Sequence, residues 1–154
     1  MKYLKDFDNI VRKIIKAKYQ YCYVCGKYVP EDERTVGHII SRRNIITRWD
    51  LNFIRMECGI CNCHEDQNNI IFRANLIEEV GTEKWEQMKA YSRLIIADSV
   101  PVKISGDNLE IYGYKIDFQV KTAECLLAEC QKLGLQTEIN RLKKIIKELK
   151  EKSF

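Results

Sequence analysis

The sequence lacks any long apolar run, and it also lacks internal repeats and low-complexity segments. A helix that spans a bilayer needs roughly 18 consecutive apolar residues, so we expect no membrane segment. The N-terminal stretch carries Asp6, Asp8 and several lysines. It therefore lacks the uncharged core of a signal peptide. Because both signals are absent, we expect a cytoplasmic location.

What the sequence does have is the composition of an ordinary globular protein. Its 154 residues are 45% hydrophobic and 31% charged, which fits one domain or one domain with an appendage. The net charge is only +4, but basic residues gather at both ends and in the middle, where the arginines are Arg42, Arg43, Arg48 and Arg55. Solvated helix faces account for the terminal clusters, whereas the central arginines are harder to explain in that way.

Four of the seven cysteines form two C-x-x-C pairs, Cys22/Cys25 and Cys58/Cys61. In a reducing compartment such pairs bind metal or do redox chemistry more often than they form disulfides. A redox pair normally stands alone, whereas two pairs supply the four thiolates of a tetrahedral Zn²⁺ site. The pattern predicts a structural zinc. Cys63 or His64 could serve as the fourth ligand in place of one of these cysteines, but either would break the paired spacing.

Hydrophobic periodicity and turn residues predict the elements of the N-terminal part. In order, these are a helix over 4–18, a hairpin that turns at 30–32 and returns along 35–40, and a loop with a short extended piece over 41–57. A helix from Cys61 to Val80 follows, which could break near Asn68-Asn69 and which Gly81 ends, and another helix begins at Thr82.

The C-terminal part has a different pattern. After about residue 94, alternation of apolar and polar residues predicts a β-hairpin with a third short strand. A helix from Thr122 to about Gly134 carries Cys125 and Cys130, which we interpret as buried small residues. The last helix, 137–152, has one apolar stripe that could pack on the body of the protein or on a second copy.

A histidine lies on the predicted strand between the two cysteine pairs, in the sequence Gly37-His38. A lone histidine is more often structural than catalytic. Here, however, the zinc would hold this strand close to the helix that begins at Cys61. That helix would present Asn62 and Asp66 at positions i and i+4, on one face. The sequence therefore predicts that these polar groups face the histidine.

In this order of motifs the sequence resembles the HNH, or ββα-metal, nucleases, and more closely the NinG/Rap phage recombination proteins. The residues that carry the resemblance lie within roughly 20–93, and they are Gly37-His38, Ser41-Arg42, Arg48-Trp49-Asp50, Cys58-x-x-Cys61-Asn62, Asn68, Phe72-Arg73, Leu76-Ile77 and Gly81. With the periodicity, this resemblance implies an α+β fold with a small zinc-stabilised ββα-metal (treble-clef) core. Residues 1–93 would form the N-terminal helix and nuclease core, and 94–154 a C-terminal β-hairpin and helical tail.

The resemblance implies a DNA endonuclease that uses Mg²⁺ or Mn²⁺ and acts on branched recombination intermediates, including four-way junctions. His38 would be the general base, since an imidazole with an unperturbed pKa of about 6.5 can accept a proton near pH 7. Asn52 would orient the imidazole ring. Asn62, with Asp66 or another carboxylate, would hold the catalytic metal. The phosphates would be bound by Arg42, Arg43 and Arg48.

The resemblance also bears on location and assembly. A phage-encoded chain would act in the cytoplasm of the host cell. Two active sites related by symmetry would suit a four-way junction, and the last helix could mediate such a homodimer.

Three positions depart from the HNH pattern. Gly37 stands where most of these enzymes place an acid or a histidine that binds the metal, and Asn62 stands in place of a histidine. Asn52 is one position away from the middle asparagine of the pattern, whose place Phe53 occupies. Asp50 is an alternative for part of that role.

Two other functions are compatible with the same residues. A non-catalytic zinc module could bind nucleic acid through the central arginines and the terminal lysines without hydrolysis. A zinc-centred interaction domain could instead bind another protein through the apolar stripe of the last helix. His38 separates the first alternative from the enzyme, because a module that only binds nucleic acid needs no imidazole there.

Overall fold

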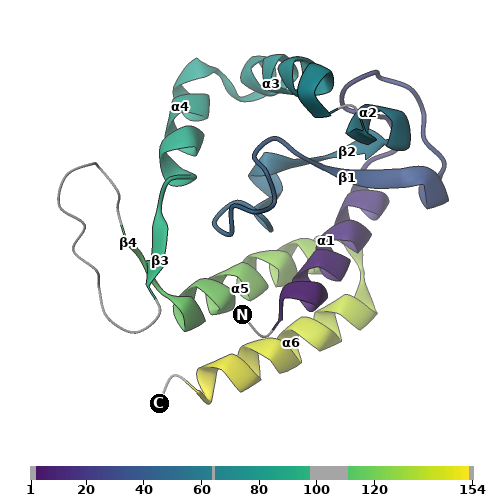
Figure 1. Cartoon of the computed structure of the whole chain (residues 1–154). Coiled ribbons are helices and arrows are strands. Elements are labelled where there is room, and N and C mark those ends of the chain that lie inside the picture. Colours follow the sequence, from purple (N-terminus) through teal and green to yellow (C-terminus); the bar gives the residue numbers. More distant parts are fainter. Residues whose placement is uncertain (1–2, 64, 98–110, 153–154) are drawn as a thin grey trace. The chain divides into compact units, whose positions relative to one another are not determined.

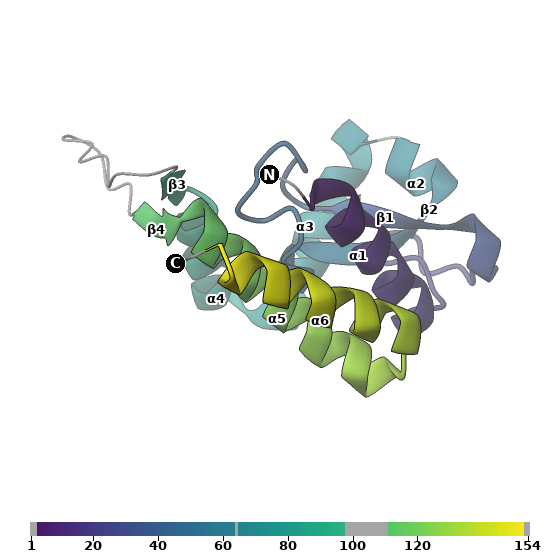
Figure 2. The same ribbon diagram turned by 90° about the horizontal axis from the view of Figure 1, so that it is seen from below.

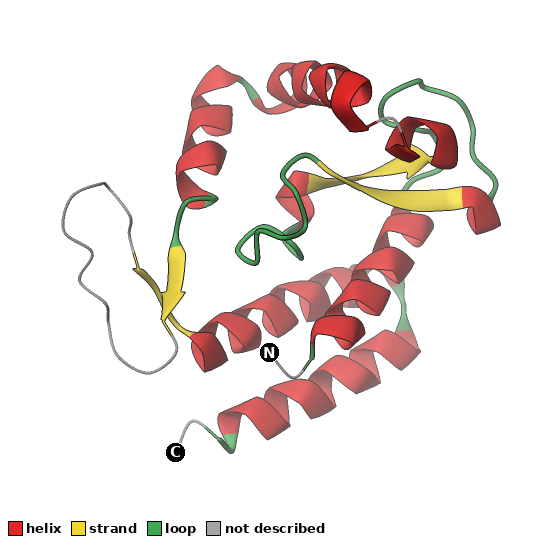
Figure 3. Cartoon of the chain, in the orientation of Figure 1, coloured by secondary structure: helices red, strands yellow, loops and turns green. Residues whose placement is uncertain are grey.

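The computed structural model describes residues 3–63, 65–97 and 111–152. Helices predominate, and each described sheet has two strands (Figure 3). In chain order the elements are α1 (Leu4–Lys18), the 3-10 turn η1 (Glu31–Glu33), β1 (Arg34–His38), the 3-10 turn η2 (Leu51–Phe53), β2 (Ile54–Cys58), α2 (Gly59–Cys63), α3 (Glu65–Val80), α4 (Thr82–Tyr91), β3 (Ile95–Ala97), β4 (Ile111–Tyr114), α5 (Lys115–Leu133) and α6 (Gln136–Lys150). Among these described helices, none is long and apolar enough to span a membrane.

The chain divides into two compact units (Figure 1). One unit consists of residues 15–92 and contains β1, β2 and α2 to α4. The other consists of residues 1–14 and 93–154 and contains β3, β4, α5 and α6. The predicted helix at 4–18 is confirmed as α1, and its residues are shared between the units. The assignment of domains to 1–93 and 94–154 stays a prediction.

β1 and β2 form the antiparallel sheet of the 15–92 unit, with Arg34 opposite Cys58 and His38 opposite Ile54. The sequence predicts a hairpin in which residues 35–40 pair with the segment before Pro30. This prediction is wrong, because β1 pairs with β2 instead. Residues 54–57 belong to the segment 41–57, which is predicted as a loop with a short extended piece. Four of the five residues of β2 are buried, so this strand does not show the alternation that marks a half-exposed strand.

The helix predicted from Cys61 to Val80 is wrong in its start, which is Gly59, and in its break near Asn68-Asn69, because α3 continues through these residues. α2 ends at Cys63 and α3 begins at Glu65. Asn62 and Asp66 thus belong to different helices, and the spacing of one continuous helix does not relate them. The predicted end at Gly81 is confirmed, because its amide donates to the carbonyl of Ile77 at 2.8 Å and its φ is 85°, a conformation that glycine adopts without strain.

The core of this unit packs α3 and α4 against the end of the sheet. Its buried residues are Ile39, Phe53, Phe72, Leu76, Trp85 and Met88. The spacing of Phe72 and Leu76 on α3, and of Trp85 and Met88 on α4, places each pair on one helix face. This packing holds the middle of α3 beside Ile39, which follows β1, and Phe53, which precedes β2.

A cluster of polar side chains fastens the first cysteine loop to α3. The Tyr23 hydroxyl donates to Glu79 Oε2 at 2.6 Å, and Arg55 Nη2 donates to Glu79 Oε1 at 2.8 Å. Burial, and then the hydrogen bond to Glu79, raise the pKa of Tyr23. Arg55 is only 7% exposed, and its guanidinium lies 5.3 Å from the Tyr23 ring centroid. This arginine of the central cluster is therefore structural.

In the other unit, α5 and α6 lie side by side (Figures 1 and 2). Arg141 of α6 forms an ion pair with Asp6 of α1 at 2.8 Å. The apolar stripe of α6 is buried within the chain: its members Ile139, Leu142, Ile145 and Leu149 are at most 7% exposed. The stripe is thus not available to a second copy in this structure, and the homodimer stays a prediction without that support.

The predicted C-terminal β-hairpin is wrong. β3 and β4 pair in parallel, with Ile95 opposite Ile111, and a tight turn cannot join parallel strands. The predicted turn falls within 98–110, outside the described residues. α5 begins at Lys115 rather than near Thr122. It buries the neighbours Phe118 and Gln119, which a strand would point to opposite faces.

The two cysteines of α5 differ in burial. Cys130 is fully buried as predicted, and burial, with Glu138 and Glu129 adding to it, raises the pKa of its thiol to about 11. The prediction for Cys125 is wrong, since this residue is exposed.

Candidate functional site

The four paired cysteines lie together in the 15–92 unit. The sulfur atoms of Cys22, Cys25, Cys58 and Cys61 all lie within 4.8 Å of one another, and those of Cys25 and Cys58 are 4.0 Å apart. A tetrahedron of Zn–S bonds of about 2.3 Å has edges of about 3.8 Å. The cluster therefore fits a structural zinc. Cys63 is exposed and lies outside the cluster, and His64 is outside the described residues.

Short turns position these thiols. The Cys22–Cys25 loop closes where the Gly26 amide donates to the Cys22 carbonyl at 2.8 Å, and the φ of 70° at Gly26 favours glycine. Burial raises the pKa of the Cys22 thiol. Backbone N–H groups that donate to its sulfur lower the pKa by a larger amount in total, so the net shift is downward. Burial and the neighbouring thiols raise the pKa of Cys61.

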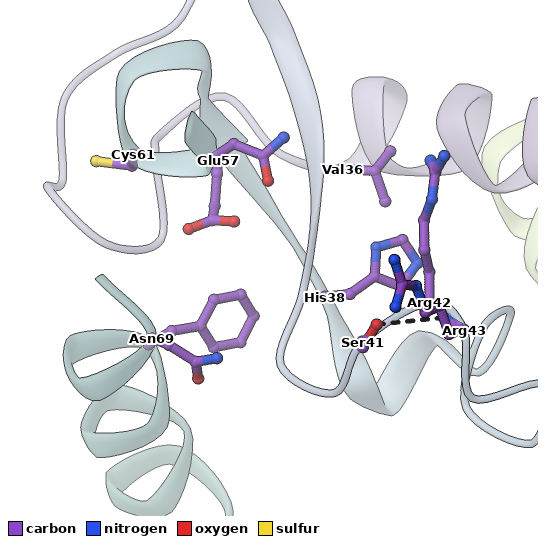
Figure 4. Close-up of a pocket in the computed structure, with 10 residues that line it drawn as sticks. Val36, His38, Ser41, Arg42, Arg43, Glu57, Cys61 and Asn69 are labelled. Carbon is purple, nitrogen blue, oxygen red and sulfur yellow. Dashed lines mark hydrogen bonds between the residues drawn. The ribbon is translucent and has the colours of Figure 1, made fainter. Parts of the chain in front are cut away.

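A pocket of about 640 Å³ lies beside the zinc cluster (Figure 4). All of its lining residues belong to the 15–92 unit, and they are Val36, His38, Ser41, Arg42, Arg43, Glu57, Cys61, Asn62, Asn69 and Phe72. The structure thus places five of the predicted site residues around one cavity: His38, Arg42, Arg43, Cys61 and Asn62.

The pocket has two sides. In Figure 4, His38 lies with Arg42 and Arg43 on one side of the β1 ribbon, and Glu57 lies with Cys61 and Asn69 on the other. The register explains this division, because Glu57 pairs with Thr35 and successive residues of a strand point to opposite faces. His38 is the last residue of β1, so a cavity that passes the end of the strand meets both faces.

The His38 ring is oriented by the main chain. Its Nε2 lies 3.1 Å from the carbonyl oxygen of Arg48. A carbonyl oxygen only accepts, so this hydrogen bond places the proton on Nε2 and leaves the lone pair of the neutral ring on Nδ1. This contact fixes the orientation of the half-buried imidazole.

The structure does not bring Asn52 to His38. Asn52 lines a different pocket with Asp50 and Phe53, and its side chain donates to Asp50 Oδ1 at 2.8 Å. The Arg48 carbonyl makes the ring contact that was predicted for Asn52. Phe53, which occupies the expected asparagine position, is part of the core.

Two further predicted residues are Arg48, which does not line the pocket, and Asp66. The Arg48 guanidinium lies 5.5 Å from the centroid of the Trp49 ring, and Arg48 is half-buried. Asp66 lies on α3, but its side chain is outside the described residues. The predicted roles of Arg48 in DNA binding and of Asp66 in metal binding stay predictions.

Sequence reasoning missed two polar residues of the pocket, Glu57 and Asn69. Glu57 is only 6% exposed. Asn69 Oδ1 is buried and has no hydrogen-bond partner among the described residues. The signal for Glu57 was its position opposite Thr35, which becomes visible only once β1 is paired with β2.

Comparison with known proteins gives one match. The model of the family described as Bacteriophage Lambda NinG protein matches residues 1–99. No curated protein and no solved structure matches the chain. The matched region is more than half of the chain, and it contains the four-cysteine cluster and every residue that lines the pocket. The chain therefore belongs to the NinG family.

Proposed function

We propose that this protein is a zinc-stabilised DNA endonuclease of the HNH type, which hydrolyses phosphodiester bonds with the help of Mg²⁺ or Mn²⁺ and acts on branched recombination intermediates. The observation that carries the proposal is the shared pocket, where an imidazole, a carboxylate, two amides and two guanidinium groups meet. Membership of the NinG family and the succession of β1, β2 and α2 beside a four-cysteine cluster support it.

His38 would act as the general base. Its Nδ1 would take a proton from a water molecule whose oxygen attacks phosphorus, while the bond from phosphorus to the 3′ oxygen breaks and that oxygen takes a proton from solvent. The hydrogen bond from Nε2 to the Arg48 carbonyl would hold the ring in place and stabilise the imidazolium that forms.

The other pocket residues would bind the substrate and the cation. Arg42 and Arg43 are exposed, so their guanidinium groups can donate to the phosphates that flank the cleavage site. Asn62 would help to hold the cation. A divalent cation bound there would stabilise the charge that develops on the phosphate oxygens and on the leaving oxygen.

A panel of DNA substrates tests the activity. We expect the zinc-loaded protein with Mg²⁺ or Mn²⁺ to cut four-way or flapped DNA faster than linear duplex of the same sequence, measured as product on denaturing gels. Equal rates on all substrates would remove the preference for branched DNA. Binding of DNA without cleavage of any substrate in either cation would favour the non-catalytic module.

The role of the two exposed arginines predicts a change in salt dependence. Each phosphate neutralised on duplex DNA contributes about 0.9 to the slope of log K against log salt. The double variant Arg42→Gln/Arg43→Gln should therefore bind more weakly, with a slope shallower by about 1.8. Fluorescence anisotropy over a salt series measures both quantities.

The control for this series is Lys27→Gln/Lys84→Gln, which removes two exposed lysines of the same unit outside the pocket lining. It should leave the slope nearly unchanged. If the arginine variant kept the slope of the unmodified protein, the phosphates would be bound elsewhere.

A further inference from the structure

Glu57 is a buried carboxylate at the pocket. It lies on β2, is 6% exposed and lines the same cavity as His38, Asn62 and Asn69. Figure 4 shows its carboxylate directed from β2 toward the helix that carries Asn69. Removing a carboxylate from water is costly, so a buried one is normally compensated by hydrogen bonds, a paired charge or a metal ion.

Gly37 gives this carboxylate its place. A Cβ built on Gly37 would lie 1.9 Å from Glu57 Oε2 and 2.5 Å from Glu57 Cδ. The φ of Gly37 is not positive, so no unusual backbone conformation calls for glycine here. A larger residue at 37 would instead displace the Glu57 side chain from its present position. The Glu57 side chain thus occupies the position that a side chain of residue 37, next to His38, would take.

Asn69 adds a second oxygen on the same side of the pocket. Its Oδ1 is buried and, within the described part of the chain, accepts no hydrogen bond. An unsatisfied buried oxygen is costly, and a bound cation is one of the partners that can satisfy it. A carboxylate oxygen and amide oxygens are the donors that Mg²⁺ and Mn²⁺ prefer in proteins, whereas Zn²⁺ prefers sulfur and nitrogen.

We propose that Glu57 supplies the carboxylate of a divalent-cation site in this pocket, with Asn69 as a further oxygen donor beside Asn62. The inference rests on the proposed nuclease function and names the residues that would serve its cation. It also accounts for the glycine before His38, since the acidic group reaches the same space from the neighbouring strand.

Binding of Mn²⁺ alone tests the inference without any DNA. The zinc-loaded protein is titrated with Mn²⁺, and the free ion is followed by its paramagnetic resonance signal. Glu57→Gln keeps the shape of the side chain but removes its charge, and we expect it to weaken Mn²⁺ binding by at least about tenfold. Asn69→Leu, which replaces the unpartnered oxygen by methyl groups, should weaken it as well.

Glu33→Gln is the matched control. It removes one carboxylate from the same unit at an exposed position in η1, and it should bind Mn²⁺ as the unmodified protein does. Zinc content and thermal unfolding of each variant show whether the fold is retained.

A swap across the strands keeps the inference testable if Glu57→Gln does not fold. In Gly37→Asp/Glu57→Ala the carboxylate enters the vacated space from β1. This double variant should bind Mn²⁺ more tightly than Glu57→Ala alone. Equal affinities for these two would overturn the inference, as would a Glu57→Gln variant with unchanged affinity.

The outcomes separate this inference from the proposed function. If Glu57→Gln binds Mn²⁺ like the unmodified protein while the latter cuts DNA, the function stands and the Glu57 site is wrong. If Mn²⁺ binding depends on Glu57 but no DNA is cut, the cation site stands and the nuclease proposal fails.

Discussion

Replacing His38 by alanine is expected to abolish DNA cleavage and to leave DNA binding nearly intact. In the proposed mechanism the imidazole accepts the proton through Nδ1, while its Nε2 lies 3.1 Å from the Arg48 carbonyl oxygen. A positioned general base contributes about 10²- to 10⁴-fold to a rate. Because the proposed phosphate contacts come from Arg42 and Arg43, the loss should fall on the chemical step. Single-turnover cleavage of branched DNA with Mg²⁺ measures the chemical step. Fluorescence anisotropy measures DNA binding separately.

The control for this experiment is Val36→Ala. Val36 lines the same pocket and lies on the same face of β1, two residues from His38, but it has no group that accepts a proton. This variant should retain most of the activity. Added imidazole should restore part of the rate of His38→Ala and none of the rate of a variant that has lost its fold. Equal cleavage by His38→Ala and the unmodified protein would refute the role of His38.

Removal of the zinc is expected to unfold the 15–92 unit. In small zinc peptides the metal contributes an apparent folding free energy of about 10–16 kcal/mol, which is as large as the whole stability of a typical domain, about 5–15 kcal/mol. The site joins the loop at Cys22 and Cys25 to the end of β2 and the start of α2. Without the ion, the metal–sulfur bonds that would join these segments are lost, and weaker contacts such as the hydrogen bond from the Tyr23 amide to the Met56 carbonyl at 2.9 Å remain.

Hydrogen exchange of the β1 and β2 amides measures this effect, before and after treatment with a chelator that strips zinc. Cys58→Ser should lose zinc and the protection of these amides even without chelator. Cys63→Ser is the matched control, because Cys63 is exposed and lies outside the cluster. A zinc content well below one ion per chain, or protection that survives chelation, would contradict the prediction.

Much of the site was predictable because its signals are local in the sequence. The spacing of two C-x-x-C pairs predicts a thiolate metal site, and the structure brings these four sulfur atoms together. The helices at 4–18 and near 137–152 were predicted within a residue or two, since their apolar stripes repeat with the helical period. The strand that carries His38 was also recognised from its own residues.

Other parts were not predictable, because they depend on contacts between distant segments. The strand that pairs with β1 is buried along most of its length and carries no alternation. The partner of the His38 ring is the main-chain carbonyl of Arg48. Every residue has such a carbonyl, so the sequence cannot indicate which one contacts the ring. The apolar stripe of α6 could pack on either of two surfaces until the structure showed it buried in its own chain.

The sequence by itself thus determined the four-cysteine cluster, the candidate base and the family resemblance, because each depends on particular side chains at short spacings. Only the tertiary structure placed the Glu57 carboxylate beside Gly37 and took Asn52 away from the pocket. Both depend on the register between β1 and β2. Register is set by the burial of whole strands across a long connection, and a shift of one residue would turn every side chain to the other face.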